Sequence, residues 1–317
     1  MELSIVISLY NEEESLRELI DWISRALEGK VSTYEIIMVD DGSTDGSWNL
    51  VKELSESHPE IRGIRFRRNY GKSAALYDGF AAAKGEIVVT MDADLQDDPE
   101  EIPEMMRMIR EDGYDLVSGW KKKRYDNVIT KNIPSKIYNA TARKVTGLKL
   151  HDMNCGLKAY RKEVVKSIEV YGDMHRFIPY LAKTAGFSRI GEKEVQHQAR
   201  KYGKSKFGME RFIHGFLDLM SVWFLQRFGK KPMHFFGGAG TLTFFIGLVI
   251  AIYLIIEKLV LQGAGKSFRP VTAQPLFYLA LVTLIIGVQL FLTGFLAELV
   301  SRSSQERNRY NIKETIR

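Results

Sequence analysis

Residues 1–119 alternate short apolar runs with longer segments in which apolar residues recur every three or four positions. The apolar runs predict buried strands at residues 3–8, 34–39, 61–66, 87–91 and 116–118. The longer segments predict helices at residues 13–27, 48–57, 73–83 and 99–110. Asn11 is suited to cap the first helix, and Pro99 is suited to the start of the fourth. The alternation is typical of an α/β, Rossmann-like domain in which crossover helices cover a parallel sheet.

Two long apolar segments near the C-terminus have a different character. Residues 235–256 and 275–297 contain no charged side chain, and each is long enough to cross roughly 30 Å of hydrocarbon as a helix. Both lie far from the N-terminus and lack a cleavage pattern, unlike a signal peptide. They predict a transmembrane hairpin, with the preceding domain and the C-terminal tail on one side of the bilayer.

Basic residues around this hairpin indicate which side that is. The outer ends carry Arg227, Lys230, Lys231, Arg302, Arg307 and Arg309, whereas the connecting loop has Lys258, Lys266 and Arg269. The positive-inside rule therefore predicts that the domain and the C-terminus are cytoplasmic. The single cysteine, Cys155, allows no intrachain disulfide, which agrees with a reducing compartment.

Two stretches combine basic and apolar residues in a way that suits a membrane surface. Residues 127–146 and 207–228 predict amphipathic helices lying in the interface. Packing against the sheet explains the first stretch equally well, whereas closeness to the first span favours the membrane for the second. The expected organisation is a catalytic domain at 1–206, a juxtamembrane helix at 207–232, two spans at 233–300 and a tail at 301–317.

Acidic residues follow one predicted strand directly. Asp92, Ala93 and Asp94 come after the run 87–91, with Gln96 close behind. In open α/β sheets ligands bind beyond the carboxyl ends of the strands, and paired carboxylates suit Mg²⁺ or Mn²⁺ bridging to a diphosphate. The alternative is a solvated loop, because an Asp-x-Asp pattern is common by chance.

Polar residues also follow the first two strands. Tyr10, Asn11 and Glu12 end the first strand, and Asp40 and Asp41 end the second. Carboxylates at such positions accept hydrogen bonds from a ribose or a base. A helix-capping turn would explain Asp40 and Asp41 alone, but polar residues at three strand ends favour a nucleotide site.

Two glycine-containing basic segments are candidates for binding phosphate. Residues 69–72 place Lys72 before a helix, and residues 200–206 form a basic loop that contains Arg200 and Lys206. Juxtamembrane charge is the alternative for the second segment. The formal net charge of +6 suits phosphates or an anionic membrane. Nucleic acid would also suit it, but would leave the acidic strand ends unexplained.

Together these motifs resemble the polyprenyl-phosphate glycosyltransferases of glycosyltransferase family 2. The likeness is carried by Tyr10-Asn11-Glu12, Asp40-Asp41-Gly42-Ser43, Asn69-Tyr70-Gly71-Lys72, Asp92-Ala93-Asp94-Leu95-Gln96 and Gly203-Lys204-Ser205-Lys206. These are inverting enzymes with a GT-A fold, related to dolichol-phosphate mannose synthase. The two-span hairpin is most similar to the bactoprenol glucosyltransferases of the GtrB type. One departure is Ser8, where the family usually has proline.

The resemblance implies roles for particular residues. It assigns the nucleotide sugar to Tyr10, Glu12, Val39, Asp41, Lys72, Asp92, Ala93, Arg200 and Lys206. It assigns Mg²⁺ or Mn²⁺ to Asp92, Asp94 and Gln96, and the acceptor phosphate to Lys131, Ser135, Arg200 and Lys206. Asp152 matches a proposed catalytic base, although a lipid phosphate is already an anion and Asp152 would orient the acceptor as much as deprotonate it. Asp94 is the second residue with a catalytic role.

The expected reaction is inverting transfer of a hexose from a nucleotide diphosphate to undecaprenyl or another polyprenyl phosphate at the cytoplasmic membrane face. The favoured hexose is glucose, with UDP-glucose as the donor. Other sugars of the mannose, galactose, amino sugar or aminoarabinose type are the alternative. A non-catalytic nucleotide-sugar-binding or scaffold protein at the membrane is a second alternative, and homo-oligomers are compatible with the glycine-rich spans. A processive polysaccharide synthase is disfavoured, because the chain lacks a Gln-x-x-Arg-Trp motif. The histidines and Cys155 are given no role, since none has the spacing of a metal site.

Overall fold

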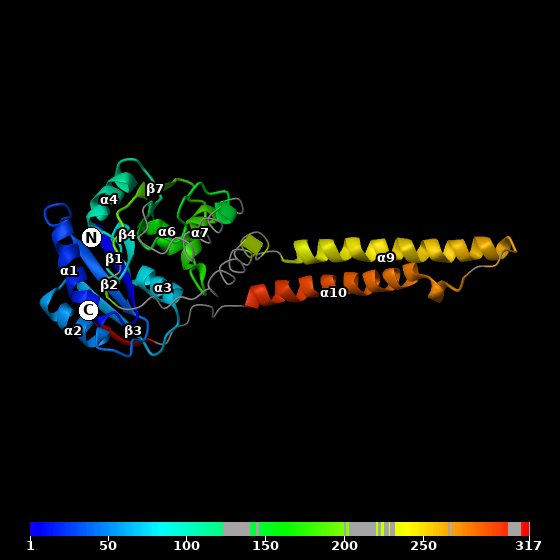
Figure 1. The fold of residues 1–317 in the computed structure, drawn as a ribbon, viewed down its shortest axis with the longest axis horizontal. Helices are drawn as coiled ribbons and strands as arrows, with labels where there is room; N and C mark the ends of the chain where they lie inside the picture. Colours follow the sequence, from blue (N-terminus) through cyan, green and yellow to red (C-terminus); the bar gives the residue numbers. More distant parts are fainter. Residues whose placement is uncertain are drawn as a thin grey trace. The chain divides into compact units, whose positions relative to one another are not determined.

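The structure is a computed structural model of the 317-residue chain. It describes residues 1–122, 140–143, 146–199, 201–202, 220, 223–224, 228, 232–265, 267, 269–303 and 312–316. The chain forms two compact units, one comprising Met1–Trp223 with Arg307–Arg317 and the other Phe224–Glu306. Each unit is described separately (Figure 1).

The first unit is built on an eight-stranded sheet. The strands are β1 (Leu3–Leu9), β2 (Tyr34–Asp40), β3 (Ile61–Phe66), β4 (Ile87–Asp92), β5 (Leu116–Trp120), β6 (Lys158–Arg161), β7 (Ile190–Glu194) and β8 (Ile312–Ile316). Their order is β7-β5-β6-β4-β1-β2-β3-β8. Strands β4, β1, β2 and β3 are parallel neighbours, as predicted. The whole sheet is mixed, because β6 runs antiparallel to β4 and β5, and β8 runs antiparallel to β3.

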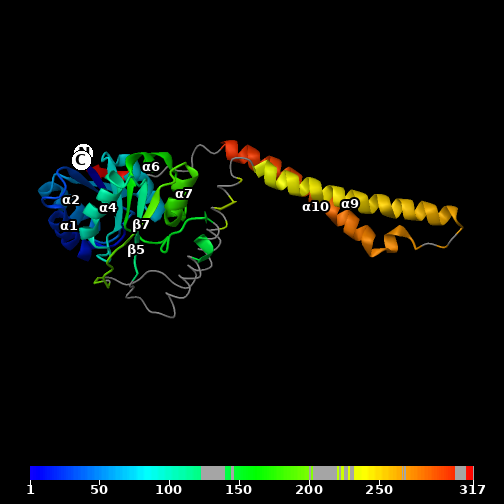
Figure 2. The same cartoon turned by 90° about the horizontal axis from the view of Figure 1, so that it is seen from above.

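Helices cover both faces of this sheet (Figure 2). They are α1 (Glu13–Leu27), α2 (Ser47–Ser57), α3 (Lys72–Ala82), α4 (Ile102–Arg110), α6 (Lys162–Ser167) and α7 (Ile178–Thr184), with 3₁₀ turns η1 (Pro99–Glu101) and η3 (Met174–Phe177). Side chains of β1 alternate between two cores: Ile5 and Ile7 pack with α1, α2 and α4, and Val6 packs with α3 and its neighbours. This two-sided burial explains why the strands are continuously apolar in sequence.

The predicted starts of two helices differ in detail. Glu12, not Asn11, precedes α1, and no side chain caps that helix. The Asn11 side chain instead accepts a hydrogen bond from the Thr44 backbone at 2.8 Å. Pro99 does begin a helix, but this is the 3₁₀ turn η1, capped by Asp98 through the Glu100 N–H at 2.9 Å.

The C-terminal strand β8 was not expected from the sequence. It pairs with the β3 edge, and Glu314 accepts a hydrogen bond from Trp48 Nε1 at 3.0 Å and forms an ion pair with Lys52. The chain therefore leaves the first unit, forms the second and returns to complete the same sheet. Both ends of the second unit are tied to one domain.

The second unit is a helical hairpin. Helix α9 (Pro232–Gly263) and helix α10 (Pro275–Ser303) are joined through the 3₁₀ turn η4 (Val271–Ala273). Both are long and apolar enough to cross a membrane, judged by length and composition. Glycines let their backbones approach closely, since a β-carbon on Gly240 would lie 2.6 Å from the Gly287 carbonyl oxygen. Large apolar side chains such as Leu242 and Val249 are exposed, as expected of surfaces that face lipid.

Candidate active site

Three strands bring the predicted site residues to one edge of the sheet. In the parallel register Ser8 of β1 lies opposite Val39 of β2 and opposite Asp92 of β4. The segments that follow these strands therefore leave the sheet side by side. This is the edge at which open α/β sheets bind ligands.

The turn after β1 is held against the turn after β2. Asn11 has a left-handed backbone with φ of 53°, which is uncommon for a residue other than glycine. Its N–H donates to Ser43 Oγ at 2.9 Å, and the Glu12 N–H donates to Ser47 Oγ at 3.0 Å. These bonds fix Tyr10 and Glu12, both partly buried, next to the β2 end.

Asp41 connects the β2 end with the loop before α3. Its carboxylate, 5% exposed, accepts the backbone N–H groups of Tyr70 at 2.7 Å and Gly71 at 2.9 Å. Burial raises the pKa of Asp41 to about 6, although both hydrogen bonds oppose that rise. Gly71 has φ of 95°, where a side chain would be strained, and this turn starts α3 at Lys72.

Lys72 reaches from the first residue of α3 to the end of β4. Its Nζ donates to Asp92 Oδ1. Burial raises the pKa of Asp92, but the charge and hydrogen bond of Lys72, together with Lys121, outweigh it and hold the pKa below its usual value. The carboxylate is therefore ionised at neutral pH.

The turn after Asp92 is strained. Leu95 is buried and has φ of 59°, a conformation that costs energy for a bulky residue. Asp94 accepts the Gln96 N–H at 3.3 Å, and the Gln96 carbonyl accepts the Gln198 N–H at 3.0 Å. These contacts hold the acidic turn against the segment that precedes Arg200.

A further carboxylate, Asp97, lies close to Asp92. A β-carbon on Gly156 would be 2.6 Å from Asp92 Oδ2 and 2.9 Å from Asp97 Oδ2. Asp97 Oδ1 pairs with Lys121 at 2.7 Å, whereas Oδ2 is buried with no hydrogen-bond partner among the described residues. Asp97 was not predicted as a site residue.

These oxygen donors fit a hard divalent cation. In the described part of the chain, no group of three His, Cys, Asp or Glu side chains is arranged to hold a metal by itself. Mg²⁺ is commonly held by one or two carboxylates, with water and substrate phosphates completing the shell. The pair of adjacent carboxylates at this edge meets that requirement.

Asp152 lies in a buried loop between β5 and β6. It is 1% exposed, and its Oδ1 accepts the Asn154 N–H at 3.1 Å. Glu192 of β7 holds this loop: its Oε1 accepts the N–H groups of His151 at 2.8 Å and Asp152 at 3.0 Å. The His151 ring contacts Glu192 Oε2 at 2.7 Å and stacks on Trp120 with centroids 4.3 Å apart.

Not all predicted residues offer a side chain to a ligand. Val39 and Ala93 are buried in the hydrophobic cores, so only their backbone atoms are available at the edge. Lys131, Ser135, Arg200 and Lys206 lie outside the described residues, as do most of the two predicted interfacial helices. The structure therefore brings Tyr10, Glu12, Asp41, Lys72, Asp92 and Asp94 to one edge of the sheet.

Other residues near the site carried no recognisable signal in the sequence. Lys121, Asn154, Lys158, His175, Arg176 and Glu192 lie around the acidic edge or support it. A buried lysine or arginine looks like a surface residue in sequence, because its burial depends on distant segments.

Comparison with known proteins identifies the family. Residues 4–169 match the family described as glycosyl transferase family 2. The chain belongs to this family. It is 38% identical over 305 residues to a dodecaprenyl-phosphate galacturonate synthase of Rhizobium johnstonii, covering 96% of this chain and 88% of that protein. It is 34% identical over 318 residues to an undecaprenyl-phosphate 4-deoxy-4-formamido-L-arabinose transferase of Aeromonas hydrophila subsp. hydrophila, covering 99% and 94%.

Solved structures agree on the fold of this glycosyltransferase. A glucosyl-3-phosphoglycerate synthase from Mycobacterium tuberculosis, solved with Mn²⁺, UDP-glucose and glycerol 3-phosphate, matches with a TM-score of 0.53 and 22% identity. The match covers 69% of this chain and 80% of that one. The predicted GT-A architecture is therefore confirmed, as is membership of a family of glycosyltransferases.

Proposed function

We propose that this membrane enzyme transfers a sugar from a nucleotide diphosphate to a polyprenyl phosphate, with Mg²⁺ or Mn²⁺ as cofactor. The observation that carries the proposal is the edge where Asp41, Lys72 and Asp92 meet, in a chain similar over nearly its whole length to two polyprenyl-phosphate sugar transferases. The apolar hairpin supports it, because a polyprenyl chain stays in lipid.

We propose a modified sugar, rather than glucose, as the donor sugar. The two relatives are named for galacturonate and for 4-deoxy-4-formamido-L-arabinose. Both names favour the alternative set of sugars over the first expectation of UDP-glucose. We propose uridine as the nucleoside, with its base donating a hydrogen bond to Asp41 and its ribose lying near Glu12.

In the proposed reaction an acceptor phosphate oxygen attacks the anomeric carbon opposite the leaving diphosphate. A C–O bond to the acceptor forms as the C–O bond to the nucleotide breaks, so the configuration inverts. A bound divalent cation would balance charge on the leaving diphosphate. Asp92 and Asp94 would hold that ion with Gln96, Asp97 lies next to Asp92, and Lys72 would hold Asp92 ionised.

Asp152 would orient the acceptor within this arrangement. Its loop is anchored by Glu192, so the carboxylate is preorganised. We assign the catalytic unit to the cytoplasmic side of the membrane. The return of β8 to the β3 edge supports a two-span path, since both ends of the hairpin then belong to one domain.

Purified full-length protein in vesicles containing undecaprenyl phosphate tests the proposal. A panel of labelled UDP-sugars is added with Mg²⁺ or Mn²⁺, and label in the organic phase is measured. Transfer should require the cation and fall at least about a hundredfold in Asp92→Asn. Asp112→Asn is the matched control, because Asp112 is exposed and pairs with Arg107 away from the site. Absence of lipid-linked label with every donor would reject the function.

A further inference from the structure

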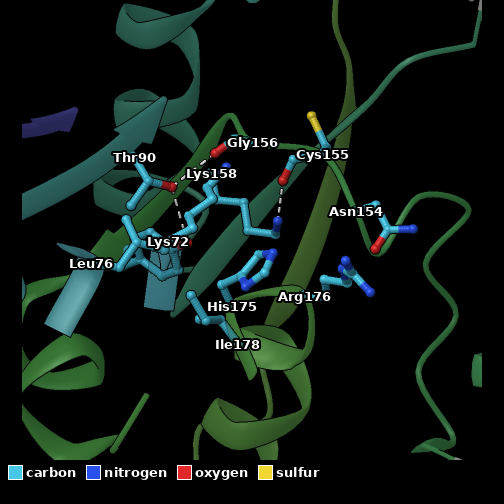
Figure 3. Close-up of a pocket in the computed structure, with 11 residues that line it drawn as sticks. Lys72, Leu76, Thr90, Asn154, Cys155, Gly156, Lys158, His175, Arg176 and Ile178 are labelled. Carbon is cyan, nitrogen blue, oxygen red and sulfur yellow. Dashed lines mark hydrogen bonds between the residues drawn. The ribbon is translucent and has the colours of Figure 1, made fainter. Parts of the chain in front are cut away.

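The strands that carry the candidate site, β4, β1 and β2, have neighbours on both sides in the sheet. On one side, Lys72, Lys158 and His175 lie together where α3, β6 and η3 meet (Figure 3). On the other side, β3 is paired with β8, which follows the apolar hairpin in the chain. Strand β3 leads into the segment 67–72, which binds Asp41 through its backbone. Neither the sequence motifs nor the resemblance assigned β8 a role.

Glu314 connects β8 with helix α2 and with β3. Its Oε2 accepts a hydrogen bond from Trp48 Nε1 at 3.0 Å, and its Oε1 pairs with Lys52. Arg65 of β3 lies directly opposite Glu314 in the antiparallel register, and residues so placed interact across the strands. Hydrogen bonds from Lys52 and Trp48, with the charge of Arg65, hold the pKa of Glu314 below its usual value. The Glu314 carboxylate is therefore bound to both neighbouring elements.

Arg65 extends these contacts to the turn that follows β2. Its guanidinium group lies over the Trp48 ring, 5.8 Å from the ring centroid. Its Nη2 donates to the Ser43 carbonyl oxygen at 3.1 Å, and its Nε lies 3.3 Å from Oδ2 of the fully buried Asp40. A guanidinium group has its donors in a rigid, planar fork. Its orientation therefore decides whether it can contact Ser43 and Asp40 together, and the Trp48 ring supports that orientation.

The turn that Arg65 contacts is closely packed against its neighbours. A β-carbon on Gly42 would lie 2.5 Å from the carbonyl carbon of Arg68, so the two backbone segments touch. Ser43 Oγ also accepts the N–H group of Asn11 at 2.9 Å, which fixes the turn after β1. A shift of Ser43 would therefore move Asn11 and the adjacent Asp41.

We propose that Glu314 is a positioning residue for the nucleotide sugar. Acting through Trp48 and Arg65, it fixes the turn at residues 40–43 in the conformation that binds the nucleoside. The inference rests on the proposed function, in which the base bonds to Asp41. Exposed ion pairs contribute little by themselves, so a role of Glu314 limited to the edge of the sheet would leave donor affinity unchanged.

Glu314→Ala and Glu314→Gln test the proposal, because glutamine still offers an oxygen to Trp48 Nε1. Lys52→Ala is the matched control, since it removes the other partner of the same carboxylate and leaves Trp48 and Arg65 in place. Arg65→Lys keeps the charge without the fork, and it is also combined with Glu314→Ala. Equilibrium binding of UDP with Mn²⁺, and of undecaprenyl phosphate in vesicles, is measured for full-length protein below the melting temperature of every variant.

Glu314→Ala should weaken UDP about three- to tenfold, and Glu314→Gln less than about twofold, with undecaprenyl phosphate affinity unchanged in both. Arg65→Lys should weaken UDP at least as much as Glu314→Ala. The double variant should bind UDP as Arg65→Lys does, because the two residues act through one turn.

Two results would overturn the inference alone. One is UDP affinity in Glu314→Ala that equals the affinity in Lys52→Ala. The other is a double variant in which the two losses of affinity multiply, since the residues would then act independently. Wild-type protein that binds no UDP would instead reject the proposed function, and this inference with it.

Discussion

Gly156 separates two carboxylates that the proposed reaction needs, and replacing it with alanine tests that arrangement. The backbone of Gly156 is not left-handed, so alanine acts through the space of its methyl group. That methyl would lie 2.6 Å from Asp92 Oδ2, roughly 0.8 Å closer than ordinary contact. Asp92 and Asp97 are both short side chains held by lysines, so they cannot yield without leaving their positions.

A displacement near 1 Å at reacting groups costs about a hundredfold in rate. We therefore expect kcat/KM for sugar transfer to fall roughly 10- to 100-fold in Gly156→Ala, with about 1–3 kcal/mol lost in stability. Gly63→Ala is the control, since its methyl would lie 2.9 Å from Trp48 and Val51 at the other end of the sheet. It should lose similar stability and keep its activity per folded molecule.

Vesicle assays and thermal unfolding of both variants decide the matter. If Gly156→Ala retains activity within threefold of wild type, the two carboxylates do not need their observed spacing. Equal loss of activity in both variants would also contradict the reasoning, because it would trace the effect to stability alone.

Three further results are expected. Burial raises the pKa of Asp41 from 3.8 to about 6, so protonated Asp41 stabilises the fold below pH 4 and this contribution is lost as the pH rises through 6. The free energy of unfolding of wild type relative to Asp41→Asn should therefore drop by up to about 3 kcal/mol between pH 4 and 7. A difference that stays constant with pH would contradict this. Glu192→Ala should lower kcat about tenfold with little change in the KM for the donor. Glu192→Gln should keep kcat within about threefold of wild type, because its side-chain oxygen can still accept hydrogen bonds from the His151 and Asp152 N–H groups. Equal losses in the two variants would argue against a role of Glu192 in positioning the Asp152 loop. Removing residues 312–317 should expose Trp48, now 1% exposed, and red-shift its fluorescence in a variant whose other three tryptophans, Trp22, Trp120 and Trp223, are replaced by phenylalanine. Unchanged emission would refute the burial of Trp48 by β8.

The sequence was sufficient for the parts of the fold that follow local rules. Strands β1 to β5 are short and mainly apolar, although β3 carries Arg62 and Arg65, and apolar residues recur along the helices between them, so both could be located within a few residues. The strand-end residues were predictable because parallel strands deliver their carboxyl ends to one edge. The hairpin helices were evident from the lack of charge over each span.

Other elements depend on distant partners and left no local pattern. Strands β6 and β7 are short and rich in charge, as in Lys158–Arg161 and Ile190–Glu194, and they read as surface segments. Lys158 and Arg176 are buried only because α3, β6 and η3 meet. Glu192 accepts a hydrogen bond from the backbone N–H of Asp152, 40 positions away, and a contact to backbone amides leaves no pattern in the sequence.

The position of β8 also has a consequence for biosynthesis. This strand is translated after both apolar helices, so the sheet of the catalytic unit has an open β3 edge until these helices have been made. Until then the unpaired edge is open to recognition by quality-control factors or to aggregation. Completion of the sheet therefore follows synthesis of both apolar helices.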